Sequence, residues 1–361
     1  MPFTSPGLFF RQVLWILAAL AGAGLPAAAQ TVSLPALNVD KSQISVSGLS
    51  SGGFMAVQFD VAYSASLKGA GVIAGGPFYC AQGSLTTATN VCSCTSLLGC
   101  TGSANTNLPQ LIAITDQDAQ DGGIDPTSNL ANQRIWLFSG TADTVVPQRV
   151  MNDLQSYYVH YIAASNIFYK NDFQAQHAMP TDSFGNSCQN LGDPYINNCH
   201  FDAAGALLQW LYGTLNPKNT GQLNGSLIQF GQSEFVSNPT SHDLDTTGWA
   251  YIPSACSGRQ VCKLHIVFHG CKQYQSYKYL SAAQGGLVTF GTTYVQHTGY
   301  NEWADTNNII VLYPQATSDW RNPNGCWDWF AYDDPNYAVK SGHQMAAVKA
   351  MIDRITGGAA R

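Results

Sequence analysis

The chain has 361 residues, a formal net charge of −6 and only 11% charged residues, against about 25% in an average soluble domain. A mild negative charge without a basic cluster argues against nucleic acid and anionic lipid as partners. The low charge, together with 17 Tyr, 16 Phe and 8 Trp, suits an exported protein that acts on an uncharged, apolar surface.

Residues 1–29 have the pattern of a secretory signal peptide. Arg11 supplies a positive charge, residues 13–25 form an apolar stretch too short to span a bilayer comfortably, and residues 27–29 form an Ala-x-Ala cleavage site. An N-terminal membrane anchor is the alternative. We therefore expect a mature protein that starts at Gln30, is secreted into the medium or a periplasm, and has no membrane association after cleavage.

After residue 30, strand-like runs alternate with helical patterns, as in a protein built on a parallel sheet. Helices are predicted at residues 54–63, 203–211, about 286–306 and 343–355. The polar segment 80–126 shows little periodicity and is expected to be a long loop held by its cysteines. The predicted strands are residues 44–47, 71–74, 134–138, 166–170, 226–230, 249–253, 264–268 and 309–313.

The first chemical motif is a G-x-S-x-G box at residues 48–52, directly after the first predicted strand and before the first predicted helix. This arrangement is typical of a nucleophile elbow, in which glycines permit a tight turn that exposes the central serine hydroxyl. Because the chain contains 34 glycines, a chance Ser/Gly loop is the alternative. The flanking elements favour Ser50 as a catalytic nucleophile.

A serine nucleophile needs a base and a carboxylate that orients the base. Asp143 follows the third predicted strand, where an α/β-hydrolase holds its acid, and His177 follows the fourth. A helix cap or an Asx turn is the alternative role for Asp143. His160 and His200 compete with His177 for the role of base. The chain order Ser50, Asp143, His177 is that of α/β-hydrolases.

An α/β-hydrolase normally has, before its nucleophile, a strand and loop that supply the second oxyanion donor, and this chain has no room for them there. The predicted strand 264–268 ends in His-Gly-Cys, which has the look of that loop. We therefore predict a circularly permuted α/β-hydrolase fold in a single domain, residues 30–361. Residues 30–215 hold the nucleophile, acid and histidine, and residues 216–361 hold the permuted half. The expected oxyanion donors are the amides of Ser51 and Cys271.

Ten cysteines in an exported chain predict five disulfides rather than a metal site. A Cys271–Cys326 bond would tie the oxyanion loop to the following Trp327 and fix it beside the reacting centre, with core packing as the alternative role of Trp327 and Trp329. The pairs favoured by proximity or context are Cys188–Cys199, Cys256–Cys262 and Cys271–Cys326.

Four cysteines remain for two further bonds: Cys80, Cys92, Cys94 and Cys100. Cys92 and Cys94 are too close to pair comfortably with each other, so each is expected to reach outward. A zinc site built from Cys92, Cys94 and Cys100 is the alternative, but the spacing fits no common zinc pattern.

In combination, these motifs resemble the secreted poly(3-hydroxybutyrate) depolymerases, in particular their circularly permuted, single-domain, Penicillium-like type. The resemblance implies an α/β-hydrolase that cleaves a short-side-chain polyester through an acyl-enzyme and needs no cofactor. It also implies that Ser50, His177 and Asp143 form the triad, that Ser51 and Cys271 supply the oxyanion amides, and that Trp327 is a wall of the subsite for the hydroxybutyrate unit. The matching residues are 46–56, 74–80, 138–144, 188–199, 264–271, 300–308 and 322–329.

The expected partner is the polyester or its hydroxybutyrate oligomers, and the protein is expected to be a monomer without a metal ion. Many extracellular members carry a linker and a polymer-binding domain. We see neither here, so adsorption is expected to come from exposed apolar residues of the catalytic domain. The closest alternative is a feruloyl or acetyl-xylan type esterase, whose H-G-C and C-W-x-W segments look similar. A non-catalytic polymer-binding protein is the alternative from another class, but such a protein would need no triad.

Overall fold

The computed structural model describes residues 1–3, 31–96, 106–281 and 284–357. The expected signal peptide, apart from its first three residues, and Cys100 lie outside this range. The chain from Thr31 onward forms one compact unit. Among the described residues, no helix is long and apolar enough to cross a membrane.

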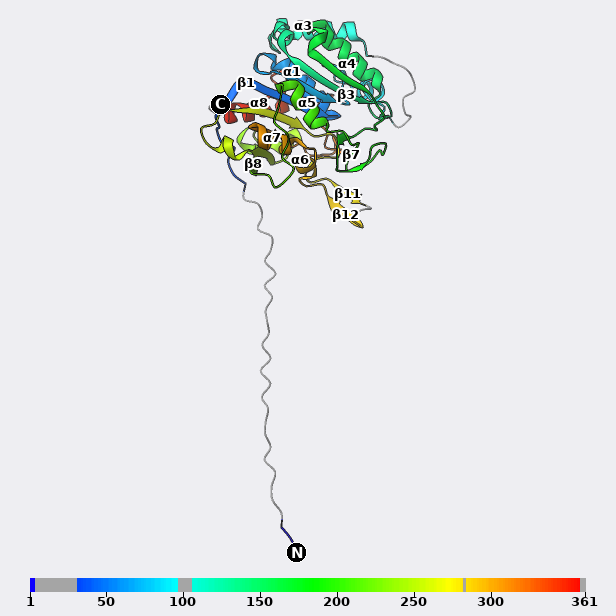
Figure 1. The fold of residues 1–361 in the computed structure, drawn as a ribbon. Helices are drawn as coiled ribbons and strands as arrows, with labels where there is room; N and C mark the ends of the chain where they lie inside the picture. Colours follow the sequence, from blue (N-terminus) through cyan, green and yellow to red (C-terminus); the bar gives the residue numbers. More distant parts are fainter. Residues whose placement is uncertain (4–30, 97–105, 282–283, 358–361) are drawn as a thin grey trace. The chain divides into compact units, whose positions relative to one another are not determined.

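An eight-stranded sheet runs through the unit (Figure 1). The order of its strands is β4-β3-β2-β1-β10-β13-β9-β8. The first six strands of this order are parallel, whereas β9 is antiparallel to both of its neighbours. All eight predicted strands are present. Their bounds are β1 (Val39–Leu49), β2 (Gly69–Ile73), β3 (Arg134–Gly140), β4 (Ile167–Phe173), β8 (Ser226–Gly231), β9 (Thr247–Ile252), β10 (Cys262–Phe268) and β13 (Ile309–Tyr313).

Helices cover both faces of the sheet and enclose two hydrophobic cores. In β3, Leu137 belongs to one core, while Trp136 and Phe138 belong to the other, because successive side chains of a strand point to opposite faces. Helices α1, α4 and α8 contribute to the first core and α5, α6 and α7 to the second. The bounds are α1 (Ser51–Ala62), α4 (Gln148–Tyr161), α5 (Ala203–Tyr212), α6 (Thr293–His297), α7 (Tyr300–Asn307) and α8 (His343–Ile355).

The arrangement is the circularly permuted α/β-hydrolase fold expected from the sequence. The nucleophile strand β1 lies between β2, from its own half of the chain, and β10, from the other half. Strands β1 and β10 run parallel, with Gly48 opposite Phe268. The carboxyl ends of the two strands therefore meet at one edge of the sheet, so the serine turn and the oxyanion loop become neighbours.

Two segments differ from the prediction. The predicted helix at 286–306 is instead strand β12 (Gly286–Thr289), which pairs with β11 (Lys278–Ser281), followed by α6 and α7. Gly299, with φ of 90°, separates those two helices. The predicted loop 80–126 contains the short α2 (Leu85–Thr87) and the 13-residue helix α3 (Leu108–Gln120), capped by the side chain of Asn107.

A separate small sheet is made of β5 (Met179–Thr181), β6 (Asn186–Ser187) and β7 (Ile196–Asn198).

Disulfide bonds link the loops that connect these strands and helices. The structure contains the three bonds favoured by the sequence, and Cys80–Cys92 is a fourth. Cys94 is also disulfide-bonded, so Cys92 and Cys94 reach to different partners, as expected. None of the described cysteines is free.

Candidate active site

The G-x-S-x-G box forms a sharp turn between β1 and α1. Ser50 has φ of 58° and ψ of −124°, a strained conformation for a residue with a side chain. A Cβ on Gly48 would lie 2.1 Å from the Gly52 carbonyl oxygen, and a Cβ on Gly52 would lie 2.3 Å from the Phe268 carbonyl oxygen. Only glycine fits at these two positions, so the box has the geometry of a nucleophile elbow pressed against the end of β10.

His177 and Asp143 form a buried pair in the loops that follow β4 and β3. Nδ1 of His177 lies 2.9 Å from Oδ2 of Asp143, and both side chains are almost completely shielded from solvent. The other oxygen of Asp143 accepts hydrogen bonds from the amides of Val145 and Val146, each at 2.8 Å. Asp143 thus makes an Asx-type turn and orients the imidazole at the same time. The turn fixes the carboxylate that faces the histidine.

Ser50 and His177 line the same cavity, which has a volume of about 690 Å³. The competing histidines do not line it: His160 lies on α4, and His200 is exposed beyond the small sheet. Of the histidines weighed as the base, the structure therefore brings only His177 to the serine.

The loop after β10, in which the sequence predicts the second oxyanion donor, lies directly against the elbow; it is called the oxyanion loop below. A Cβ on Gly270 would lie 3.3 Å from both the Leu49 carbonyl oxygen and the Ser50 Cβ. The Gly270 amide donates to Oε1 of Gln273 at 2.7 Å, which fixes the loop. Neither the Ser51 amide nor the Cys271 amide has an acceptor in the described part of the chain.

His269 lies at the start of this loop, and its imidazole is neutral. Its Nδ1 faces the Gly270 carbonyl oxygen at 2.7 Å and must donate, whereas its Nε2 accepts from the Ala316 amide at 3.1 Å. Burial lowers the pKa of His269 to about 4. Since one ring nitrogen donates and the other accepts, the imidazole serves as a fixed structural link and not as a second base.

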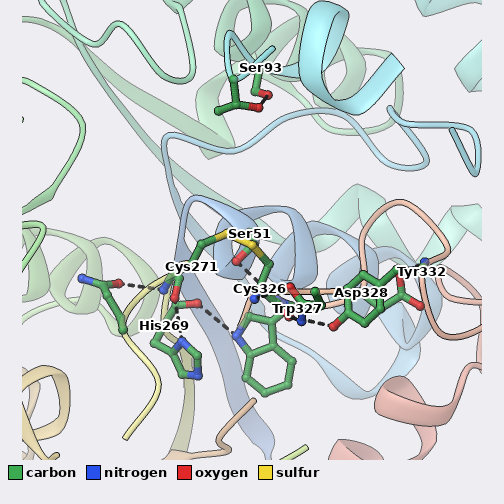
Figure 2. The surroundings of a disulfide bond; sticks show 12 residues. Ser51, Ser93, His269, Cys271, Cys326, Trp327, Asp328 and Tyr332 are labelled. Atoms are coloured by element: carbon green, nitrogen blue, oxygen red, sulfur yellow. Dashed lines mark hydrogen bonds between the residues drawn. A yellow bond between two sulfur atoms is a disulfide. The ribbon is translucent and has the colours of Figure 1, made fainter. Parts of the chain in front are cut away.

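The Cys271–Cys326 disulfide joins the oxyanion loop to the segment that carries the two tryptophans (Figure 2). The expectation that Trp327 is a wall of the cavity is wrong: its side chain is 0% exposed and does not line the cavity. Its indole N–H donates to the His269 carbonyl oxygen at 3.0 Å, and its amide approaches Oγ of Ser51 at 3.4 Å. The His269 carbonyl oxygen supplies the acceptor that this buried indole N–H needs, and the ring lies inward beneath the oxyanion loop.

Trp329 occupies the place that the sequence suggested for Trp327. It lines the cavity and stacks on Phe54, with ring centroids 4.1 Å apart and planes at 16°. Trp320, 87% exposed, lines the cavity as well. The C-W-x-W pattern indicates an aromatic wall but not which tryptophan forms it, and no sequence signal marks Phe54 or Trp320. Further apolar lining comes from Leu49, Leu85, Ala88, Val145, Val146, Pro323 and Phe330.

Known proteins with similar sequences are polyester depolymerases, although no family model matches the chain. The chain is 50% identical over 345 residues to the poly(3-hydroxybutyrate) depolymerase of Delftia acidovorans. That match covers 94% of this chain but 65% of the Delftia protein, so the chain spans about two thirds of that relative. It is also 39% identical over 365 residues to the polyhydroxybutyrate depolymerase of Talaromyces funiculosus, covering 96% of this chain and 98% of that protein.

Solved structures give the same result. The crystal structure of PHB depolymerase from Penicillium funiculosum has a TM-score of 0.80 and 39% identity, and the match covers 91% of this chain and 99% of that one. A serine-to-alanine variant of PHB depolymerase complexed with an R3HB trimer has the same TM-score and coverage, with 38% identity. Because the chain spans nearly the full length of relatives to which it is 39% identical, it belongs to the polyhydroxybutyrate depolymerase family.

Proposed function

We propose that this protein is a secreted serine esterase that hydrolyses poly(3-hydroxybutyrate), or its oligomers, through an acyl-enzyme. Ser50 is the nucleophile, His177 the base and Asp143 the carboxylate that orients it. The observation that carries this proposal is the strained serine turn in one cavity with a histidine whose Nδ1 lies 2.9 Å from a buried aspartate.

In the first step, Oγ of Ser50 attacks the ester carbonyl carbon and its proton passes to Nε2 of His177. The Asp143 contact keeps a proton on Nδ1, which leaves the Nε2 lone pair free to act as the base. The tetrahedral intermediate then collapses, and the imidazolium returns its proton to the departing hydroxyl end of the polyester. Water attacks the acyl-serine by the same route, so each cycle cleaves one ester bond and requires only these side chains and water.

The amides of Ser51 and Cys271 are proposed to bind the oxyanion of each tetrahedral intermediate. Ser51 is the first residue of α1, where an amide has no partner within the helix. Both amides lack an acceptor among the described residues, and Gly270 next to Cys271 packs on Ser50. Loss of one such donor typically costs about 3 to 4 kcal/mol of transition-state stabilisation.

The shape of the cavity supports an apolar acyl chain as the substrate. Phe54 and Trp329 form a stacked aromatic wall beside Ser50, and aliphatic side chains line the cavity together with polar ones such as Lys272 and Asn324. A PHB depolymerase of the same fold has been solved with an R3HB trimer, which supports hydroxybutyrate oligomers as ligands.

Clearing of a poly(3-hydroxybutyrate) suspension, with hydroxybutyrate products identified, tests the proposal. The mature protein should clear the suspension, and Ser50→Ala should abolish both clearing and turnover of a soluble short-chain ester without altering the fold. Residual turnover of the soluble ester by Ser50→Ala would exclude Ser50 as the nucleophile. If wild type turns over soluble esters but produces no hydroxybutyrate from polymer or trimer, the substrate assignment is wrong while the triad stands.

Secretion and a monomeric state complete the proposal. The signal-peptide pattern of residues 1–29 and the disulfides of the described residues both support export to an oxidising compartment. N-terminal sequencing of secreted protein and light scattering test these two points.

A further inference from the structure

Three side chains with metal-ligating atoms gather outside the catalytic cavity: His242, Asp333 and His343. Their ligand atoms all lie within 4.8 Å of one another. Nδ1 of His242 lies 3.1 Å, and Nδ1 of His343 3.0 Å, from the same oxygen, Oδ2 of Asp333. None of the three lines the catalytic cavity, so the esterase chemistry does not account for them.

The two N···O distances are hydrogen-bond distances that also fit neighbouring ligands of one metal ion. Zinc bonds to imidazole nitrogen and carboxylate oxygen are about 2.0–2.2 Å long, which in a tetrahedral site places neighbouring ligand atoms about 3.3 Å apart. The two observed N···O separations are within a few tenths of an ångström of that value. The two imidazole rings also lie close, with centroids 3.9 Å apart. A small shift of the side chains would therefore bring all three donors onto one ion.

The backbone that carries these ligands is already fixed. His242 ends a short 3₁₀ helix (Pro239–His242), and His343 is the first residue of α8. Gln344 links the two regions: its Nε2 donates to the His242 carbonyl oxygen at 2.8 Å, and its Oε1 accepts from the Asp328 amide at 2.9 Å. The Asp328 carboxylate in turn accepts from the Asp333 amide at 3.2 Å. A site held in this way loses little conformational freedom when it binds an ion.

The same side chain of Asp328 ties the cluster to the disulfide segment. Its carboxylate accepts from the Tyr332 amide at 3.1 Å, and the Tyr332 hydroxyl donates to the Cys326 carbonyl oxygen at 2.7 Å (Figure 2). The cluster is therefore connected through three hydrogen bonds, by way of Asp328 and Tyr332, to the cysteine that anchors the oxyanion loop. An ion bound there would brace the wall of the catalytic cavity without touching the substrate.

Charge favours a cation at this place. Arg321 is shared among three carboxylates: its Nε bonds Asp319 at 2.8 Å, while Asp333 and Asp243 are only approached, at 3.7 and 3.8 Å. Asp334 adds a further carboxylate, 3.4 Å from Nδ1 of His343. The Asp333 carboxylate is 96% buried and lies 3.7 Å from the guanidinium, and a bound divalent metal ion would place a closer positive charge beside it.

We propose that His242, Asp333 and His343 bind one divalent transition-metal ion, with Zn²⁺ as the expected ion and water completing the tetrahedral shell. Two imidazoles and one carboxylate suit Zn²⁺, whereas Mg²⁺ and Ca²⁺ prefer sets of oxygen ligands. The side chains of His242 and His343 are 22% and 45% exposed, which leaves a path for entry of the ion. The ion acts as a structural clamp that joins the 3₁₀ helix, the Asp333 segment and the start of α8.

Calorimetric titration of the metal-free mature protein with ZnCl₂ tests the proposal, with CaCl₂ as the hard-ion comparison. His343→Gln removes one ligand, and His160→Gln is the matched control because it removes an exposed histidine on α4, away from the cluster. Wild type and His160→Gln should each bind one equivalent of Zn²⁺ and no Ca²⁺. Binding by His343→Gln should weaken at least about 100-fold, the upper end of the loss seen when only an outer partner of a ligand is removed.

Thermal unfolding gives a second, independent readout. Zn²⁺ at 100 times its Kd should raise the Tm of wild type and His160→Gln by about 4 °C, and should leave that of His343→Gln unchanged. His242→Gln must behave like His343→Gln, and replaces it if that variant does not fold. Absence of Zn²⁺ binding by wild type, or equal Zn²⁺ affinity in wild type and the ligand variants, would overturn the site.

Discussion

Loss of the Cys271–Cys326 bond should lower stability and slow catalysis, and the structure gives a magnitude for each. The bond closes a loop with a sequence separation of 55 residues, for which the chain-entropy model gives about 4 kcal/mol of stabilisation. Unfolding a domain of about 330 residues has an entropy near 0.7 kcal/mol/K at its midpoint, so the Tm of the double variant Cys271→Ser/Cys326→Ser should fall by about 6 °C.

The catalytic effect should be partial because hydrogen bonds still hold the oxyanion loop. The Gly270 amide keeps its bond to Gln273, the Lys272 amide keeps its 2.7 Å bond to the Asn324 carbonyl oxygen, and Trp327 keeps its bond to His269. Complete loss of one oxyanion donor costs about 10²–10³ in kcat. With these bonds in place, we expect kcat to fall about 10-fold and KM to change little, since the oxyanion contact is strongest in the transition state.

Steady-state hydrolysis of a soluble short-chain ester, measured well below both Tm values, separates the two effects. The control is Cys256→Ser/Cys262→Ser, which opens a loop with a separation of 6 residues, worth about 2 kcal/mol, away from the cavity. The control should lose stability but keep its kcat. Equal kcat values for the two double variants would show that the Cys271–Cys326 bond does not position the oxyanion donor. Reduction of Cys271 in wild type without a change in rate would lead to the same conclusion.

Two further predictions concern the aromatic wall and a buried acid. Trp329→Ala should raise KM for hydroxybutyrate trimer about 10-fold or more, with a smaller change in kcat, because the substitution removes a cavity wall and no reacting group. An unchanged KM would exclude Trp329 from the subsite. Burial raises the pKa of Asp60 to about 7. The folded protein therefore retains a proton that the unfolded chain releases near pH 3.8. The free energy of unfolding should consequently fall as pH rises from about 4 to 7. Asp60→Asn should remove about 3 kcal/mol of this decline in urea unfolding measured at pH 5 and pH 8, because about two pH units separate pH 5 from the folded pKa and each is worth about 1.4 kcal/mol; identical pH dependence in both proteins would refute the assignment.

The sheet and the positions of the three proposed triad residues could be predicted because their signals are local. Strand β13 is buried at every residue and reads as a continuous apolar run, as a central parallel strand should. The serine box, the acid and the histidine each follow a predicted strand directly, and parallel strands bring their carboxyl ends to one edge. The side chains of Ser50, Asp143 and His177 could therefore be placed together before the structure was known.

The secondary-structure predictions were wrong where tertiary contacts, and not the local sequence pattern, decide which residues are buried. Leu287 is 65% exposed on strand β12, so an apolar residue there suggested the buried face of a helix, whereas helical structure begins only at α6. Helix α3 was missed for the opposite reason, since only Leu111 and Thr115 are buried and the helix depends on the Asn107 cap. In these segments, hydrophobic periodicity carries no information about burial.

The choice between the two tryptophans and the composition of the metal cluster depend on contacts between distant segments. Trp327 turns inward because the His269 carbonyl oxygen, 58 residues away, accepts its indole N–H. His242 lies 91 residues before Asp333, a separation that matches no metal-binding pattern. Neither arrangement leaves a trace in local spacing.

Chain order matters little to this site, because the contacts that build it are made between strand ends. The two halves of the fold meet along β1 and β10, and the oxyanion loop reaches Ser50 from the half that comes later in the sequence. The amide of Leu37, just before β1, donates to the carbonyl oxygen of Ile355, at the end of α8, at 2.7 Å. In an unpermuted α/β-hydrolase the chain would pass directly from such a helix into the nucleophile strand. The hydrogen bond thus spans the point at which the permuted chain is open, and the neighbouring ends explain how the catalytic geometry is kept while the order of its parts is changed.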